Sequence, residues 1–424
     1  MSIKIQNIIS RMILDSRGFP TIESEIYLSD GAQGRACVPS GASTGDKEAL
    51  ELRDGDASWL GKGVSRALNN IEDSLCPQII GQDPFNIKQI DQTMINIDGT
   101  ENKANIGANA TLAISLATVR AAAASAKQPL FQYISHNLVK NKLKNYVMPT
   151  PMMNILNGGS HADNNVDIQE FMIVPIEFSS YSEALKAGTE VFHTLKEILK
   201  KQNYNTAIGD EGGFAPNLKE NQEAIELILN AIEKAGYNQK IKLALDVAAS
   251  ELYDKTQQSY CLNNREYLSE ELIDYYKKLC SNYPIISIED GLDQNDWQGW
   301  IKLNKSLGKK IQIVGDDLTV TNTKLLDKAI KQEAMNSILV KLNQIGTVSE
   351  TLETIALAQA NNFGVIISHR SGETEDTFIS DLSVATGAGQ IKTGSLCRTD
   401  RTAKYNQLLR IEEKIRNNSI YGIK

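Results

Sequence analysis

The chain has 424 residues, of which 41% are hydrophobic and 23% are charged, and its formal net charge is −8. This length allows a large buried core, either in two or three domains or in a small domain with a barrel, and the composition is that of an ordinary globular protein. The acidic balance argues against nonspecific binding of nucleic acid, because such binding needs a basic face.

The cysteines are an odd number and are widely spaced, with no CxxC pair among them. They are Cys37, Cys76, Cys261, Cys280 and Cys397. This usage predicts a reducing compartment, and it favours neither a disulfide framework nor a zinc site.

The sequence predicts a cytoplasmic protein without a signal peptide or a membrane span. The N-terminal segment MSIKIQNIISRMILDSRG has no long apolar stretch, and Arg11 and Asp15 interrupt it. The most membrane-like stretch, GANATLAISLATVRAAAASA, contains Arg120 and is rich in alanine, which is typical of a tightly packed helix.

Residues 1–140 have the pattern of a mixed α+β domain. ESEIYLSDGAQGRACVP alternates around an Asp-Gly pair, which predicts a β-hairpin. Helical stretches follow, namely GVSRALNNIEDSL and the alanine-rich residues 105–127. The loop SGASTGDKE, residues 40–48, is rich in small residues, and a mobile lid and a simple hairpin connection are equally good interpretations.

Residues 141–424 repeat a different pattern, in which short apolar runs alternate with helical stretches. This predicts βα units and a parallel sheet. Six successive runs each end in a polar side chain, and spacing of this kind favours a TIM-like barrel, whose active face lies at the carboxyl ends of the strands. An open doubly wound sheet is the alternative. The six residues are Asp246, Glu289, Asp316, Lys341, His369 and Lys392.

Three of these strand ends carry carboxylates, at Asp246, Glu289 and Asp316. A site made only of oxygen ligands selects Mg2+ over zinc. The alternative is that each residue caps the helix that follows its strand. Three in succession at barrel spacing favour the metal site.

Two of the strand ends carry lysines, Lys341 and Lys392, inside apolar runs where a lysine is costly to bury. A metal charge and a second lysine could push one of them toward neutrality and make it a base. Otherwise each is an extended surface side chain.

Three polar loops are further candidates. NGGSHADNNVDIQEF contains His161, Gln169 and Glu170, and GDEGGFAPN contains Glu211. SHRSGETED follows an apolar run, and an arginine beside a serine and a glycine is well suited to holding a phosphate. Each loop taken alone could also be a solvated turn.

The sequence resembles the enolase family, and its bacterial members in particular, nearly from end to end. The motifs that carry the resemblance are ILDSRG, SGASTG, MPTPMMNILNGGSHADNNVDIQEFMIVP, GDEGGFAPN, SIEDGL, VGDDL, ILVKLNQIGT, SHRSGETEDTFI, GQIKTG and RTAKYNQLLRIEE. The resemblance implies an eight-stranded TIM-like β/α barrel over residues 141–424, with a smaller α+β domain over residues 1–140.

The resemblance also implies the reaction, which is the Mg2+-dependent dehydration of 2-phosphoglycerate to phosphoenolpyruvate. Lys341 would take the proton from C2, and Glu211 would protonate the departing C3 hydroxyl. Glu211 must then be protonated when needed, so we expect Glu170 and other nearby carboxylates to raise its pKa.

Two Mg2+ ions are implied for each active site. Asp246, Glu289 and Asp316 would bind the first ion, and Ser43 in the lid loop would help to hold the second. The remaining implied residues contact the substrate: Arg370 and Ser371 at its phosphate, Lys392 at its carboxylate, and His161, Gln169, Glu170 and His369 elsewhere along it.

The sequence departs from the family at Phe19, where enolases usually have asparagine after SRG. We expect this position to shape the N-terminal domain rather than the chemistry.

Two rival functions stay open from sequence alone. Another member of the superfamily, acting on a different carboxylate, would keep the metal ligands and lose the phosphate set. A binding protein that retains the motifs is the second rival, since enolases are known as plasminogen binders at the cell surface and as members of RNA-degrading assemblies. The terminal Lys424 is a lysine of the kind that plasminogen recognises. The resemblance further implies a homo-oligomer, either a dimer or an octamer.

Overall fold

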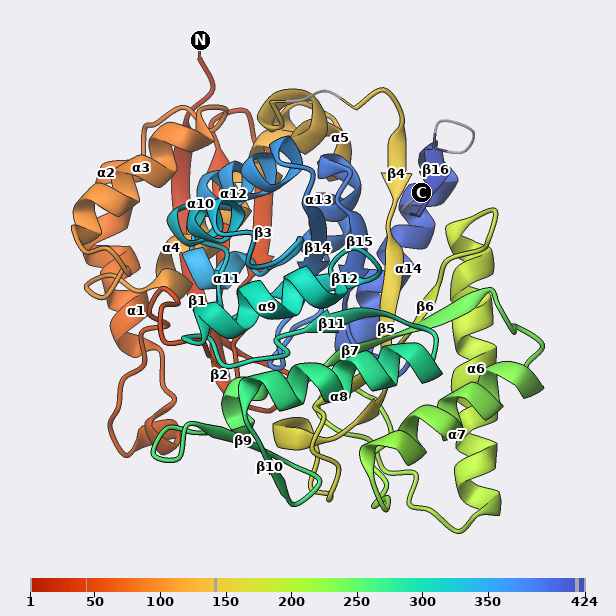
Figure 1. The fold of residues 1–424 in the computed structure, drawn as a ribbon. Helices are drawn as coiled ribbons and strands as arrows, with labels where there is room; N and C mark the ends of the chain where they lie inside the picture. The colour runs from red at the N-terminus through yellow and green to blue at the C-terminus, as the bar shows by residue number, and fades with distance from the viewer. Residues whose placement is uncertain (1, 43, 141–142, 416–418, 423–424) are drawn as a thin grey trace.

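The computed structural model describes residues 2–42, 44–140, 143–415 and 419–422. A smaller N-terminal part packs against a closed barrel that the rest of the chain forms (Figure 1). Ser43 and Lys424, singled out from the sequence, lie outside the described residues, and so do residues 141–142 beside the predicted domain boundary.

The N-terminal part is built on an antiparallel sheet in the order β1-β2-β3. Its strands are β1 (Ile5–Leu14), β2 (Pro20–Leu28) and β3 (Gln33–Cys37). The predicted hairpin is the β2–β3 pair, and its turn contains the Asp-Gly pair.

Helices cover one face of this sheet, and the predicted alanine-rich helix is α4. They are η1 (Ser58–Gly61), α1 (Ser65–Asn70), η2 (Ile71–Leu75), α2 (Cys76–Ile79), α3 (Ile87–Asp98), α4 (Ala108–Ser125), α5 (Leu130–Tyr133) and η3 (Ile134–Leu138). The small residues of α4 let it approach β3 closely, and a Cβ atom on Gly34 would lie 2.2 Å from the backbone nitrogen of Ala121.

The barrel closes in the order β11-β12-β13-β14-β15-β5-β6-β7. Its strands are β5 (Thr150–Asn157), β6 (Glu170–Pro175), β7 (Ile241–Asp246), β11 (Ile285–Glu289), β12 (Gln312–Gly315), β13 (Ser337–Val340), β14 (Gly364–Ser368) and β15 (Gly389–Lys392). The predicted TIM-like barrel is therefore confirmed, but the expectation of a purely parallel sheet is wrong. β6 runs antiparallel to both β5 and β7, because residues 158–169 connect β5 to β6 without a crossover helix.

Helices surround the barrel, and several begin at a side-chain cap. Ser180 accepts a hydrogen bond from the Glu183 amide at the start of α6, and Thr347 does the same for Glu350 at α12. The helices are η4 (Gly159–His161), α6 (Tyr181–Lys201), α7 (Asn221–Lys234), η5 (Ala249–Leu252), α8 (Ser269–Asn282), α9 (Trp297–Leu307), α10 (Thr323–Lys331), α11 (Leu342–Ile345), α12 (Val348–Ala360), α13 (Phe378–Thr386) and α14 (Thr399–Ile415).

Two small sheets lie outside the barrel. One joins β8 (Tyr253–Asp254), β9 (Ser259–Leu262) and β10 (Arg265–Tyr267), and the other pairs β4 (Tyr146–Met148) with β16 (Ser419–Tyr421). The second pairing ties the first strand after the predicted domain boundary to the end of the described chain.

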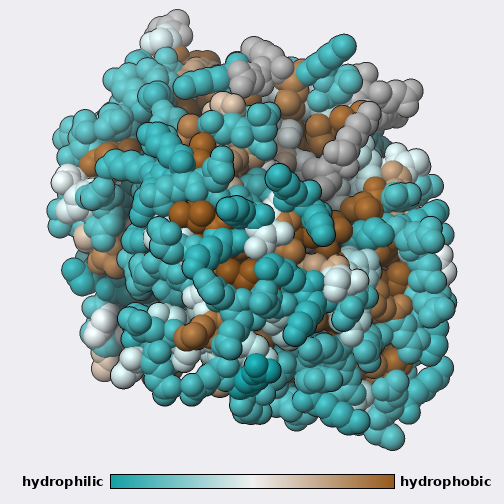
Figure 2. All heavy atoms as spheres, viewed as in Figure 1, coloured by the Kyte–Doolittle hydropathy of each residue, from teal (hydrophilic) through white to brown (hydrophobic). Residues whose placement is uncertain are grey.

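The barrel interior is filled with apolar side chains, so the barrel is a packed core rather than a pore. They are Met152, Met172, Val174, Ala244, Val314, Leu339 and Ile366. The face of the molecule in Figure 2 is mainly hydrophilic, with hydrophobic residues scattered over it. Among the described helices, none has the length and apolar character that crossing a membrane requires.

Candidate functional site

The six polar residues predicted at strand ends all lie where a barrel strand finishes. Three are the last residues of their strands: Asp246 on β7, Glu289 on β11 and Lys392 on β15. The other three directly follow a strand: Asp316 after β12, Lys341 after β13 and His369 after β14. This placement is what a barrel needs for one shared site.

A pocket lies at this end of the barrel, and most of the predicted site residues line it. Glu289 does not line the cavity, but it accepts a hydrogen bond from Lys392, which does line it. The predicted residues in the lining are His161, Gln169, Glu170, Glu211, Asp246, Asp316, Lys341, His369, Arg370, Ser371 and Lys392.

Lys392 lies at the centre of the acidic side of the cavity and is only 2% exposed. Its Nζ atom lies 2.6 Å from Asp246 Oδ2, 2.8 Å from Glu289 Oε1 and 3.3 Å from Glu170 Oε1. Burial lowers the pKa of Lys392, but these carboxylates outweigh it and hold the pKa well above its usual value. Lys392 is therefore a fixed positive charge rather than a base.

Lys341 Nζ donates to Oδ2 of Asp316, the third predicted ligand. Gln344 Nε2 donates to Asp316 Oδ1 over 2.7 Å. Burial lowers the pKa of Lys341, but the negative charges of Asp316 and Glu289 together outweigh this effect, so the net shift is upward. The direct contact with a carboxylate thus favours the charged form of Lys341, and the expected push toward neutrality by a metal charge stays a prediction.

The acidic residues fit a hard cation. Asp246, Glu289 and Asp316 offer only oxygen ligands, and among the described residues Glu289 Oε2 is buried with no hydrogen-bond partner. The structure does not bring all three to one point, because Lys392 holds two of them and Lys341 holds the third. A cluster with ligand oxygens within 4.8 Å of one another forms instead from Asp290, Asp316 and Asp317.

Glu170 and Glu211 form a pair of buried carboxyl groups. Burial and the charge of Glu211 raise the pKa of Glu170 well above its usual value. Burial also raises the pKa of Glu211, but His369, His161 and Arg401 outweigh it, so its pKa lies well below the usual value. The expectation of a raised pKa for Glu211 is therefore wrong here, and within the pair it is the pKa of Glu170 that is raised.

His161 joins this pair to the phosphate side of the cavity. Its Nδ1 atom lies 3.5 Å from Glu170 Oε1 and 3.8 Å from Glu211 Oε1, and its Nε2 atom lies 3.3 Å from Ser371 Oγ. Burial lowers the pKa of His161. Gln169 Oε1 accepts a hydrogen bond from Ser160 over 2.7 Å, and Gln169 is part of the cavity lining.

Arg370 is the cation of the predicted phosphate loop, and it is 3% exposed. Its NH1 group donates to Glu48 Oε2 over 2.8 Å and to Asn343 Oδ1 over 3.2 Å. Glu48 is the last residue of the predicted lid loop, and Ser40, the first, forms a β-bridge with Gly372. The lid loop is thereby joined at both ends to the phosphate loop.

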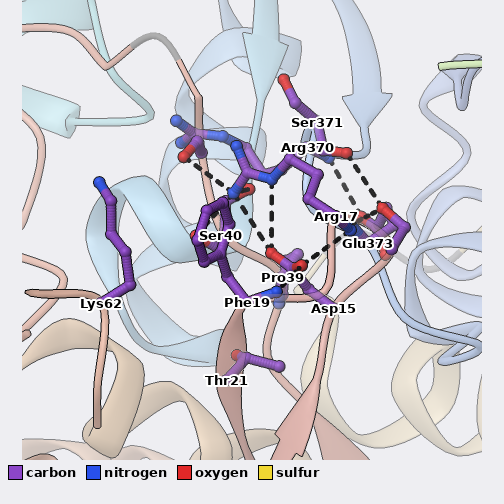
Figure 3. Close-up of polar contacts among 12 residues, drawn as sticks. Asp15, Arg17, Phe19, Thr21, Pro39, Ser40, Lys62, Arg370, Ser371 and Glu373 are labelled. Atoms are coloured by element: carbon purple, nitrogen blue, oxygen red, sulfur yellow. Dashed lines mark hydrogen bonds and ion pairs between the residues drawn. The ribbon is translucent and has the colours of Figure 1, made fainter. Parts of the chain in front are cut away.

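Phe19 lies in the turn between β1 and β2, close to this loop (Figure 3). Its amide donates to Asp15 Oδ1 over 3.0 Å, and Arg17 reaches from the same turn to Ser40 Oγ over 3.1 Å. Phe19 also lines a second, larger cavity with Arg17 and residues of the lid loop. The position thus belongs to the N-terminal domain, at its contact with the site.

Sequence reasoning missed several residues that contact the site. Asn154 Nδ2 donates to Glu211 Oε2 over 3.1 Å, and its signal is a lone amide in the buried run MPTPMMNIL. Arg401 NH1 lies 2.6 Å from His369 Nδ1, and its signal is a charged residue that falls on the buried face of a helix. Gln344 and Glu48 lie in motifs that the sequence analysis singled out, ILVKLNQIGT and SGASTGDKE, but no contact with the site was predicted for either residue.

Two family models match the chain. Residues 5–134 match the enolase N-terminal domain, and residues 145–424 match the enolase C-terminal TIM barrel domain. Together they span nearly all of the sequence and both parts of the structure. The chain, with its closed eight-stranded barrel and its acidic strand ends, belongs to the enolase family.

Proposed function

We propose that this protein is an enolase, a lyase of glycolysis and gluconeogenesis that interconverts 2-phosphoglycerate with phosphoenolpyruvate and water. The observation that carries the proposal is a single buried cavity lined by Lys341, Glu211 and the Arg370–Ser371 pair. These supply a base, a carboxylic acid and a phosphate site, which are the three parts this reaction requires.

The proton steps fall to two side chains. Lys341 Nζ takes the proton from C2, the electron pair left there forms the C2–C3 double bond, and the C3–O bond breaks. Glu211 gives a proton to the departing hydroxyl, which leaves as water. Because burial and the charge of Glu211 raise the pKa of Glu170, we infer that Glu170 holds a proton and passes it to Glu211 when the substrate binds.

Lys341 must lose its proton before it can act. Burial lowers its pKa, Arg370 and Lys392 lower it further, and the contact with Asp316 is the largest effect in the opposite direction. Release from Asp316 therefore favours the neutral amine.

The other side chains orient the substrate. Arg370 and Ser371 bind its phosphate, Lys392 faces its carboxylate, and His369 lies beside Glu211 at the C3 end. The fixed charges of Arg370 and Lys392 hold the two anionic groups of the substrate apart, which sets C2 toward Lys341.

Mg2+ is the cation we propose for the acidic strand ends, with Asp246, Glu289 and Asp316 as ligands of one ion and Ser43 as a ligand of a second. When bound, the two ions supply positive charge that stabilises the second negative charge on the substrate carboxylate.

The test measures phosphoenolpyruvate by its ultraviolet absorbance, with Mg2+ and with EDTA. We expect turnover that requires Mg2+, and a decrease in kcat of about a thousandfold in Lys341→Ala. Lys324→Ala is the control, because Lys324 is an exposed lysine that pairs with Glu101. Absence of turnover by the folded, Mg2+-supplied protein would overturn the proposal, and activity on an unphosphorylated hydroxy acid would support the rival dehydratase.

The bacterial type, the dimeric or octameric state and the cytoplasmic location stay predictions. A second role as a secreted or surface plasminogen-binding protein, or as a member of an RNA-degrading assembly, is also untested. Unchanged plasminogen binding after deletion of Lys424 would contradict the version of this idea that rests on the terminal lysine.

A further inference from the structure

Arg401, in the first turn of α14, is fully buried and uses its guanidinium to join two loops of the site. Its NH1 group lies 2.6 Å from both His369 Nδ1 and the Arg370 carbonyl oxygen. Its NH2 group donates to the Ser371 carbonyl over 2.5 Å and to the Asp210 carbonyl over 3.3 Å. The residues next to Glu211 and those of the phosphate loop thus share one cation.

The contact with His369 fixes which ring nitrogen carries the hydrogen. A guanidinium has five N–H donors and no acceptor, so His369 Nδ1 must accept. The neutral ring then has its hydrogen on Nε2. Burial lowers the pKa of His369 to about 3, and Arg401 lowers it as well, so the ring is neutral near pH 7.

The Nε2 atom lies 3.3 Å from Glu211 Oε2, within hydrogen-bond distance, although its direction does not make a hydrogen bond in this structure. Asn154 Nδ2 donates to the same oxygen over 3.1 Å. A carboxyl oxygen has two in-plane lone pairs, so Oε2 has no position left for a hydrogen of its own once the His369 Nε2–H group donates to it beside Asn154. When Glu211 receives its proton, the acidic hydrogen is therefore directed to Oε1.

We propose that Arg401 is a positioning residue: it holds His369 as the Nε2–H tautomer and so directs the proton of Glu211 to Oε1, from which it is given to the departing hydroxyl. The proposal rests on the proposed function of Glu211. It predicts that Arg401 serves the protonation of the C3 hydroxyl and not the removal of the C2 proton by Lys341.

A simpler role for Arg401 is to brace the carbonyl groups of residues 210, 370 and 371. Arg398 offers a matched control, because it also binds carbonyl oxygens near the site, those of Ser16 at 2.9 Å and Gly209 at 3.5 Å. Within the described part of the chain its polar partners do not include His369, so Arg398→Gln loses a brace and leaves the imidazole as it is.

The first measurement reads the protonation of His369 directly and does not depend on a variant that could misfold. The protein has four histidines, so nitrogen-15 labelling of histidine gives a spectrum simple enough to assign, and His369→Gln identifies the resonances of His369. We expect the unsubstituted protein to show His369 as the neutral Nε2–H tautomer from pH 6 to 8, and Arg401→Gln to show a mixture of tautomers. A hydrogen on Nδ1, or a protonated ring, in the unsubstituted protein would overturn the proposal.

The second measurement compares two rates in the same sample, namely exchange of the C2 hydrogen of 2-phosphoglycerate with deuterium from the solvent and formation of phosphoenolpyruvate. We expect Arg401→Gln to lower product formation about 10- to 100-fold while exchange falls much less, so that the ratio of exchange to product formation rises about tenfold. Arg398→Gln should leave this ratio unchanged.

A merely bracing role would lower both rates together in Arg401→Gln, and an unchanged ratio would overturn the proposal. Arg401→Lys keeps the positive charge but loses the planar guanidinium that donates in several directions. It should therefore also raise the ratio of exchange to product formation. If the unsubstituted protein forms no phosphoenolpyruvate, the proposed function fails, while the tautomer spectrum still decides whether Arg401 sets the state of His369.

Discussion

Lys392 Nζ lies 2.6 Å from Asp246 Oδ2, and both groups are buried at the ends of their strands. Glu289, paired with Asp246 in register across β7 and β11, lies 2.8 Å from the same nitrogen. One lysine thus balances carboxylates from two adjacent strands. Because a buried charge without a partner is strongly destabilising, this lysine holds the acidic site together as well as facing the substrate.

Replacement of Lys392 by methionine should destabilise the Mg2+-free protein by about 3–5 kcal/mol, because it leaves buried carboxylates uncompensated. Urea unfolding in EDTA measures this change. Lys302→Met is the control, since the pair between Lys302 and Glu270 is exposed and its loss should leave the unfolding midpoint unchanged. Equal midpoints for the two variants would show that Lys392 does not stabilise the site.

Mg2+ should stabilise the protein through the acidic strand ends. At about 100 times its Kd, a ligand of the folded state adds about 2.7 kcal/mol to the free energy of unfolding. We expect Glu289→Gln to lose most of this gain, because Glu289 offers the one buried carboxylate oxygen of the predicted ligands without a partner among the described residues. Thermal unfolding with and without Mg2+ measures it. Glu197→Gln, on the exposed side of α6, should keep the full gain, and a full gain in Glu289→Gln would contradict the ligand assignment.

The barrel and the strand-end residues could be predicted because a polar side chain at the end of an apolar run is visible in the sequence itself. The antiparallel direction of β6 could not be predicted, since the sequence of residues 158–169 is compatible with a loop that leads into a parallel strand or into an antiparallel one. Contacts between side chains that are far apart in the sequence could not be predicted either. The pKa of Glu211 depends on His369 and Arg401, which follow it by more than 150 residues, and the helix pattern alone gives Arg401 no partner.

Arg370 and Glu48 form a buried pair at 2.8 Å, with side chains that are 2% and 8% exposed. If Arg370 holds the substrate phosphate, Glu48 competes with that phosphate for the same guanidinium. Glu48→Gln should therefore tighten the binding of inorganic phosphate by about tenfold, or about 1.4 kcal/mol. Calorimetric titration measures the Kd.

Arg370→Met serves as the reference for that titration, because it removes the cation of the proposed phosphate site. Weaker binding in Glu48→Gln than in the unsubstituted protein would mean that Glu48 orients Arg370 for the phosphate and does not compete with it.

Asp91 of α3 connects the N-terminal part to the barrel, since its Oδ2 atom accepts the Ser349 amide at the start of α12 over 2.9 Å. It is fully buried, and burial raises its pKa from 3.8 to about 6, although hydrogen bonds from Ser349 and Ser115 act in the opposite direction. The folded protein therefore retains the Asp91 proton to a higher pH than the unfolded chain does.

The sign of the pH dependence follows from this difference. The contribution of Asp91 to stability is complete below pH 3.8 and is lost as the pH rises through 6. Asp91→Asn carries no titrating group but keeps an oxygen that can accept from Ser349. Its free energy of unfolding should therefore rise relative to the unsubstituted protein by about 2 kcal/mol between pH 4.5 and 7, and level off above. Urea unfolding of both proteins across this range measures the difference, in which the other titrating groups cancel. A difference that is constant with pH would show that Asp91 is already ionised in the folded protein, because only a group with unequal pKa values in the two states gives a slope.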